Sequence, residues 1–72
     1  SDIYALGIVA IQALTGVHPG KLTRNIDDNI NDLVNTNAST GLKNVLNNMV
    51  RIQSSQRYQS VFEVLKALEQ LE

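Results

Sequence analysis

Residues 3–15 read IYALGIVAIQALT, and ten of these thirteen residues are apolar. Ser1 and Asp2 precede it and are residues that cap helix N-termini, and Gly16 follows it, where a left-handed residue ends many helices. The apolar residues surround this predicted helix and leave it without a polar face. It is too short to cross the roughly 30 Å of hydrocarbon in a bilayer. The sequence therefore predicts a helix at 3–15 that is buried inside protein.

The rest of the chain is too small to bury such a helix on every side. The chain has 72 residues, and a domain of this size buries only about 60 % of the surface that its unfolded chain exposes. We therefore expect either that the chain is part of a larger protein, or that it self-associates through helix 3–15 and so covers the helix.

Two further helices are predicted from apolar residues that recur at helical spacing. The first, at about 40–51, begins after a cap at Ser39 or Thr40. The second, at about 61–71, follows a capping box formed by Ser60 and Glu63. The positions that we expect these helices to bury are Leu42, Val45, Leu46, Met49, Val50, Val61, Val64, Leu65, Leu68 and Leu71. No strand is predicted, so the predicted fold is all-α, with three to four helices.

Residues 25–38 are rich in Asn and Asp, whose side chains favour turns and caps. A weak apolar pattern at helical spacing (Ile26, Ile30, Leu33 and Val34) indicates a short irregular helix or a loop. Asn25, Asp27 and Asn29 are spaced like the first ligands of a calcium-binding loop. The Gly and the closing Glu that such a loop needs are both absent, so no metal site is predicted.

Composition excludes several other functions. The chain has 6 Lys and Arg against 7 Asp and Glu, and no cluster of basic residues on a predicted helix, which argues against nucleic acid as a partner. It has no Cys and no Gly-rich phosphate loop. The single His, His18, stands in a Pro-Gly turn without a second ligand, and we expect it at the surface. No secretory leader is recognisable, so a cytoplasmic location is expected. From the residues alone, no catalytic, cofactor-binding or metal-ligating residue is predicted.

Two motifs nevertheless resemble one known family. SDIYALGIV at residues 1–9, continuing to LTGVHP at 14–19, resembles the stretch that opens the long central helix in the C-terminal lobe of Ser/Thr protein kinases of bacterial type. SSQRYQS at 54–60, followed by an apolar helix, resembles the D-P-x-x-R-x-S/T ending of the same lobe. The motifs stand in the family's order, and the resemblance covers essentially the whole chain. It implies that residues 1–72 are a fragment of a kinase domain, with helix 3–15 as the buried axis of the lobe.

The resemblance assigns structural roles to two residues. Asp2 matches the family Asp whose carboxylate accepts hydrogen bonds from the backbone of the catalytic loop. Arg57 matches the family Arg that forms an ion pair with a Glu closing the activation segment. Because both partners lie outside this sequence, simpler roles are favoured here. Asp2 is then an N-cap, and Arg57 is a solvated residue before the last helix.

The resemblance also implies a function for the parent protein, which would transfer the γ-phosphate of ATP to a protein Ser or Thr. Its ATP and Mg would be held by a Gly-rich loop, a Lys, an H-R-D motif and a D-F-G motif, none of which occurs here. The expected partners are the rest of the kinase domain (N-lobe, catalytic loop and activation segment) and the parent's protein substrate. The fragment alone should be inactive. The alternative is a non-catalytic helical interaction or oligomerisation module, such as a pseudokinase remnant.

Overall fold

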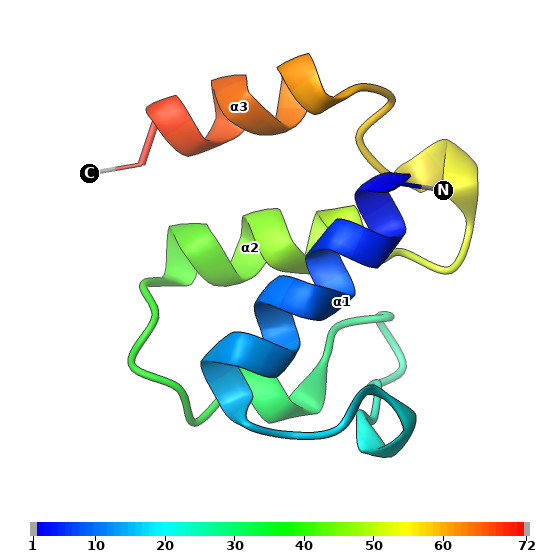
Figure 1. Cartoon of the computed structure of the whole chain (residues 1–72), viewed down its shortest axis with the longest axis vertical. Coiled ribbons are helices and arrows are strands. Elements are labelled where there is room, and N and C mark those ends of the chain that lie inside the picture. Colours follow the sequence, from blue (N-terminus) through cyan, green and yellow to red (C-terminus); the bar gives the residue numbers. More distant parts are fainter. Residues whose placement is uncertain (1, 72) are drawn as a thin grey trace.

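The computed structural model describes residues 2–71. Its three α-helices confirm the predicted all-α fold, and the described residues contain no strand. The helices are α1 (Asp2–Thr15), α2 (Thr40–Met49) and α3 (Val61–Glu69), and short 3-10 turns lie between them at η1 (Pro19–Lys21), η2 (Asn31–Leu33) and η3 (Ser54–Gln56). Both α1 and α3 pack against α2. Figure 1 shows α1 crossing α2, with α3 running alongside α2.

The helix ends follow local side-chain chemistry. Gly16 has a φ of 73° and its N–H donates to the carbonyl of Gln12, so α1 ends as predicted. The predicted cap at Ser1 lies outside the described residues. Ser39 Oγ accepts from the N–H of Leu42 and starts α2, but α2 ends at Met49, two residues before the predicted end. The end of α3 at Glu69 is likewise two residues early.

The cap of α3 differs in one detail from the predicted capping box. Ser60 Oγ accepts from the N–H of Glu63, as expected. The Glu63 carboxylate, however, accepts from the N–H of Gln59 rather than from that of Ser60. The side chain therefore reaches one residue further back and ties the preceding connection to the helix.

The core is formed where the three helices and η2 meet. Its buried side chains are Ile3, Ile11, Ile30, Leu33, Val45, Leu46, Met49, Val50 and Val64. Of the predicted positions in α2, only Leu42 is incompletely buried. In α3, only Val64 is buried, and Val61, Leu65 and Leu68 are exposed, so the expected burial of that stripe was wrong. It was wrong because α3 packs mainly against α2 rather than in a cleft between two helices.

Helices α1 and α2 touch at a glycine. A Cβ atom at Gly7 would lie 2.7 Å from Val50 Cγ1 and 2.9 Å from Met49 Cβ. Only a residue without a side chain allows this approach. The buried stripe of α1 is accordingly Ile3, Gly7 and Ile11.

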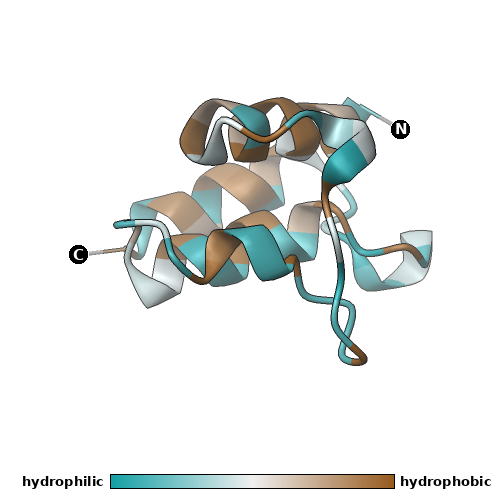
Figure 2. Cartoon of the chain, turned by 90° about the horizontal axis from the view of Figure 1, so that it is seen from below, coloured by the Kyte–Doolittle hydropathy of each residue, from teal (hydrophilic) through white to brown (hydrophobic). Residues whose placement is uncertain are grey.

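The Asn-rich connection is not a helix over the predicted positions. Ile30 and Leu33 are buried, but Ile26 is fully exposed and Val34 is 67 % exposed. Asp28 has a φ of 61°, which breaks any helix between Ile26 and Ile30. Figure 2 shows this connection as a largely hydrophilic loop beside more hydrophobic helices.

The remaining departure concerns the outer side of α1. Leu6 is 51 % exposed and Val9 is 61 % exposed, although the sequence predicted burial on every side. Residues 2–71 bury one side of the helix and leave the other exposed. No helix among residues 2–71 combines the length and the hydropathy needed to cross a membrane.

Candidate functional site

Three arginines from different segments gather near the first turns of α1. We call Arg24, Arg51 and Arg57, together with Tyr4 and Asp28, the arginine cluster. Arg24 Nη1 donates to Asp28 Oδ1 and to the carbonyl of Val50, each at 2.8 Å. Its Nη2 donates to the Tyr4 hydroxyl at 3.2 Å. Arg24 thereby joins α1, the loop that follows it and the end of α2.

Arg51 holds the loop from its other side. Its Nη1 donates to the carbonyls of Asp28 at 2.7 Å and Asp27 at 3.2 Å, and to Asn29 Oδ1 at 2.8 Å. The opposite edge of the guanidinium donates to Asn48 Oδ1. The planar guanidinium has five N–H donors and can reach all these acceptors at once. The single ammonium group of a lysine could not.

Asp28 is the acidic centre of the cluster. Its Oδ1 accepts a hydrogen bond from Arg24 Nη1, and its Oδ2 accepts one from the backbone N–H of Ile52 at 2.9 Å. Partial burial raises the pKa of this carboxyl. The hydrogen bonds from Ile52 and Arg24, with the positive charges of Arg24 and Arg51, outweigh that effect and hold the pKa below its ordinary value. The carboxylate is thus kept charged where it binds two segments together.

Arg57 is not the solvated residue that the simpler interpretation expected. It is half-buried, and its Nε donates to the carbonyl of Arg51 at 2.6 Å while Nη2 donates to that of Ile52 at 3.0 Å. Its guanidinium lies 5.0 Å from the centre of the Tyr4 ring, a cation–π distance. Arg57 therefore fastens the connection before α3 to α1 and to the end of α2.

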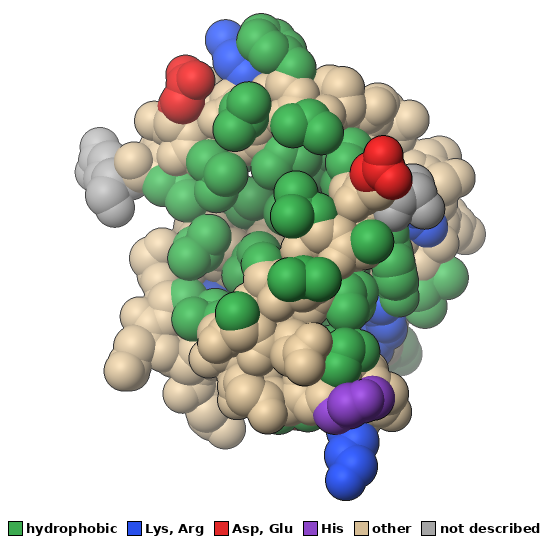
Figure 3. All heavy atoms as spheres, in the orientation of Figure 1, with side chains coloured by type: hydrophobic (Ala, Val, Ile, Leu, Met, Phe, Trp, Pro, Cys, Tyr) green, Lys and Arg blue, Asp and Glu red, His purple; other side chains and the backbone are tan. Residues whose placement is uncertain are grey.

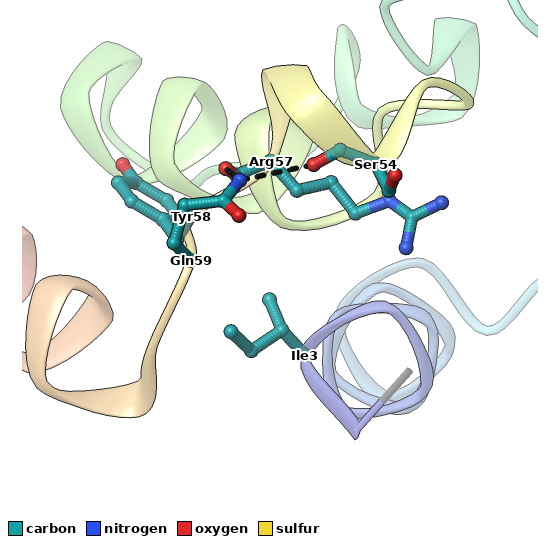
Figure 4. Close-up of a pocket in the computed structure, with 5 residues that line it drawn as sticks. All are labelled: Ile3, Ser54, Arg57, Tyr58 and Gln59. Carbon is teal, nitrogen blue, oxygen red and sulfur yellow. Dashed lines mark hydrogen bonds between the residues drawn. The ribbon is translucent and has the colours of Figure 1, made fainter.

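A small pocket of about 130 Å³ lies beside Arg57. Figure 4 shows Ile3 of α1 pointing toward the segment that carries the other lining residues, Ser54, Arg57, Tyr58 and Gln59. Gln59 Nε2 donates to the carbonyl of Ser54 at 3.0 Å and closes this segment on itself. The pocket thus combines an apolar wall with a cationic side chain.

The two residues singled out by the resemblance lie at the same end of α1. Asp2 is exposed in the first turn, where its carboxylate interacts favourably with the positive end of the helix dipole. Arg57 lies beside Ile3 and Tyr4, the next residues of that helix. Residues more than fifty positions apart in the chain are therefore neighbours in space.

The sequence did not reveal Arg24, Asp28 or Arg51 as a cluster, because the contacts that join the loop to Val50, Arg51 and Ile52 span more than twenty residues. The calcium-like spacing has a different use. Asn25 Oδ1 accepts the N–H groups of Asp27 at 2.9 Å and Asn29 at 3.0 Å, which makes it the capping residue of a turn. Among the described residues, no group of His, Asp and Glu side chains is arranged to hold a metal ion.

His18 lies at the surface, as predicted. Its Nδ1 accepts the N–H of Gly20 at 3.0 Å and so starts η1.

The hydrogen bonds of the arginine cluster connect separate segments of backbone, and the cluster therefore holds these segments together.

No family model, curated protein or solved structure matches this chain.

Proposed function

We propose that this chain is the helical scaffold of the C-terminal lobe of a Ser/Thr protein kinase. The parent would transfer the γ-phosphate of ATP to a Ser or Thr hydroxyl of a protein substrate. The observation that carries the proposal is the occurrence of two separated motifs in family order, at residues 1–19 and 54–60. In this proposal the chain contributes support, and ATP and Mg are bound by parts of the parent outside it.

The position of Arg57 supports the proposal. Its side chain turns inward, beside the helix that carries Asp2, instead of extending into solvent. In the parent, Asp2 would brace the catalytic loop by accepting its backbone N–H groups, and Arg57 would form an ion pair with a Glu at the end of the activation segment.

The apolar outer side of α1 is also accounted for. A helix that is the axis of a larger lobe needs Leu6 and Val9 to meet further helices. The rest of the kinase domain is then the partner that covers them.

The deciding experiment is to read the open reading frame upstream of Ser1. The proposal expects a Gly-rich loop, a Lys, H-R-D and D-F-G in that order. Their presence with intact catalytic residues supports an active kinase. The same frame with those residues replaced indicates a pseudokinase, and a frame without them overturns the proposal.

The role of Asp2 has its own test in the parent protein. Asp2→Asn should lower the rate of phosphoryl transfer about 10- to 100-fold, as expected for losing a charge-assisted hydrogen bond. Asp27→Asn is the matched control, because this carboxylate is exposed on the loop after α1. Equal rates for the two variants would contradict the bracing role.

The second candidate is a non-catalytic helical oligomerisation module. The exposure of Leu6 and Val9 favours it, since an oligomer would cover them equally well. The upstream reading frame distinguishes the two candidates, because this one requires no kinase motifs.

A further inference from the structure

Five residues from four segments are joined in a closed network of contacts. Asp28 Oδ1 accepts from Arg24 Nη1 at 2.8 Å, and Arg24 Nη2 donates to the Tyr4 hydroxyl at 3.2 Å. The Arg57 guanidinium lies 5.0 Å from the centre of the Tyr4 ring, and its Nη2 donates to the Ile52 carbonyl at 3.0 Å. The N–H of Ile52 leads back to Asp28, where it donates to Oδ2 at 2.9 Å. We call Tyr4, Arg24, Asp28, Ile52 and Arg57 the closed network.

Each member of the closed network uses two different groups for its two neighbours. Asp28 uses one carboxylate oxygen for Arg24 and the other for Ile52. Ile52 uses its N–H for Asp28 and its carbonyl for Arg57. Tyr4 uses its hydroxyl for Arg24 and the face of its ring for Arg57. The five contacts therefore do not compete, and each is held in place by the other four.

The closed network is partly shielded from water. The side chains of Arg24 and Asp28 are 22 % and 23 % exposed, and Tyr4 and Arg57 are half-buried. In Figure 3, hydrophobic side chains cover much of the side on which α1 and α3 are seen, and few charged side chains reach it. An ion pair held partly out of water is screened less than an exposed one. A change at Asp28 is therefore felt at Arg24 and at the Tyr4 hydroxyl that Arg24 binds.

Both arginines of the closed network also bind the chain directly after α2. Arg24 Nη1 donates to the carbonyl of Val50 at 2.8 Å, and Arg57 Nε donates to that of Arg51 at 2.6 Å. Carbonyls at the C-terminal end of a helix lack partners within the helix and attract positive charge. The end of α2 is thus shared by the loop at residues 24–30 and the connection at residues 51–59.

We propose that the closed network couples this loop to this connection, so that a change in one is transmitted to the other through Tyr4. Tyr4 belongs to α1 and lies in neither segment, yet it contacts an arginine from each. A molecule that bound the loop and drew Asp28 away would therefore also loosen Arg57. In the parent, the loop would then regulate the ion pair of Arg57 with the activation segment, and this last step rests on the proposed function.

The first test removes the Tyr4 hydroxyl and keeps the aromatic face. Amide hydrogen exchange of the Tyr4→Phe chain, measured by NMR, reports on both segments. In the loop, the Asn29 N–H donates to Asn25 Oδ1. In the connection, the Arg57 N–H donates to the Ser54 carbonyl. Both exchange rates should rise about fivefold, because opening either segment no longer breaks the hydrogen bond of the hydroxyl.

Two controls separate coupling from a general loss of structure. Tyr58→Phe removes a tyrosine hydroxyl outside the closed network and should change neither rate. The Lys21 amide donates to the His18 carbonyl in η1, also outside the network, and should keep its wild-type rate in Tyr4→Phe. Acceleration at Asn29 without acceleration at Arg57 would overturn the proposal. An equal acceleration at Lys21 would overturn it as well, since the hydroxyl would then support the fold in general.

The second test opens the closed network at another contact. Asp28→Asn leaves one oxygen where the carboxylate has two, so it cannot accept from both Arg24 and Ile52 in their present positions. In the wild-type background it should raise the exchange rate of the Arg57 amide about fivefold. In the Tyr4→Phe background the network is already open, and the same change should add less than about twofold.

Asp32→Asn is the matched control for this second test. Its carboxylate accepts the N–H of Thr23 at 2.9 Å, outside the closed network, so the Arg57 amide should keep its rate in both backgrounds. Equal factors for Asp28→Asn in the two backgrounds would mean that the contacts act independently, and would overturn the coupling. Both tests use the 72-residue chain, so their failure leaves the kinase proposal standing. An upstream frame without kinase motifs would remove only the regulatory step.

Discussion

The loop at residues 24–30 and the outer side of α1 have opposite relations to the rest of the chain. The loop is polar. Asn25 Oδ1 accepts an N–H within it, and Arg51 and the N–H of Ile52 donate to Asp28 from the end of α2. The outer side of α1 is apolar, and Leu6 and Val9 on it lie exposed. Hydrogen bonds hold the loop in place, whereas the packing that stabilises the fold lies on the buried side of α1.

The two sides of α1 should differ most in their contribution to the free energy of unfolding. Ile11 is fully buried, and Ile11→Ala should lower the free energy of unfolding by about 2–5 kcal/mol, because it leaves a cavity. Val9→Ala, two residues away on the exposed side, should change it by less than about 0.5 kcal/mol. Urea denaturation at low protein concentration measures both. Equal losses would mean that the two sides of the helix are covered alike.

The next effect concerns the contact of α1 with α2. Gly7→Ala should cost about 1–3 kcal/mol, because the new Cβ would overlap Val50 and Met49. Gly41→Ala is the matched control. Its Cβ would lie 2.7 Å from Leu71 Cδ2, the end of a flexible side chain that can move. This control should be neutral or slightly stabilising, since Ala favours helix over Gly. A neutral Gly7→Ala would show that the helices can separate without loss.

A smaller effect is expected in the polar loop. Arg51→Lys keeps the charge but cannot reach the acceptors on Asp28 and Asn29 together, so it should cost about 1 kcal/mol. Hydrogen exchange at the Asn29 amide, which is bonded to Asn25, should accelerate. Lys21→Arg, at an exposed position in η1, should leave both quantities unchanged. Unchanged exchange in the Arg51→Lys variant would show that Asn25 alone holds the loop.

The smallest expected effect is a decrease in the free energy of unfolding as the pH falls in the acidic range. The pKa of Asp28 is lowered in the folded chain, so its contribution to stability is complete above the ordinary pKa of 3.8. The contribution is lost as the pH falls through the lower, folded value. The unfolding midpoint of the wild type should therefore fall more steeply in this acidic range than that of Asp28→Asn, which keeps the shape and the tolerance of a positive φ. Parallel curves for the two proteins would assign no such role to Asp28.

The sequence predicted the features that depend on near neighbours. Gly16 and Ser39 mark helix ends through contacts within four residues. Gly16 was assigned correctly, and Ser39 was one of the two predicted caps. The periodic apolar residues of α2 also identified most of its buried side. Periodicity could not show that α3 packs mainly against α2, so Leu65 and Leu68 were assigned to the core.

The arginine cluster could not be predicted for a related reason. Arg24 reaches Val50, and Arg51 reaches Asp27, across more than twenty residues of chain. The sequence gives no period or spacing for such pairs. Arg57 was noticed only through the resemblance, and its inward position came from the structure.

The hydrogen bonds of Arg51 have a consequence for the order in which the chain folds. Arg51 directly follows α2, and its loop acceptors, Asp27 to Asn29, lie more than twenty residues earlier in the sequence. Until α2 has formed and docked on α1, these acceptors are out of reach of the Arg51 guanidinium, and closing so long a segment is entropically unfavourable. The loop should therefore be the last part to reach its native structure. In time-resolved folding experiments it would follow the helices, and in native conditions it would open first.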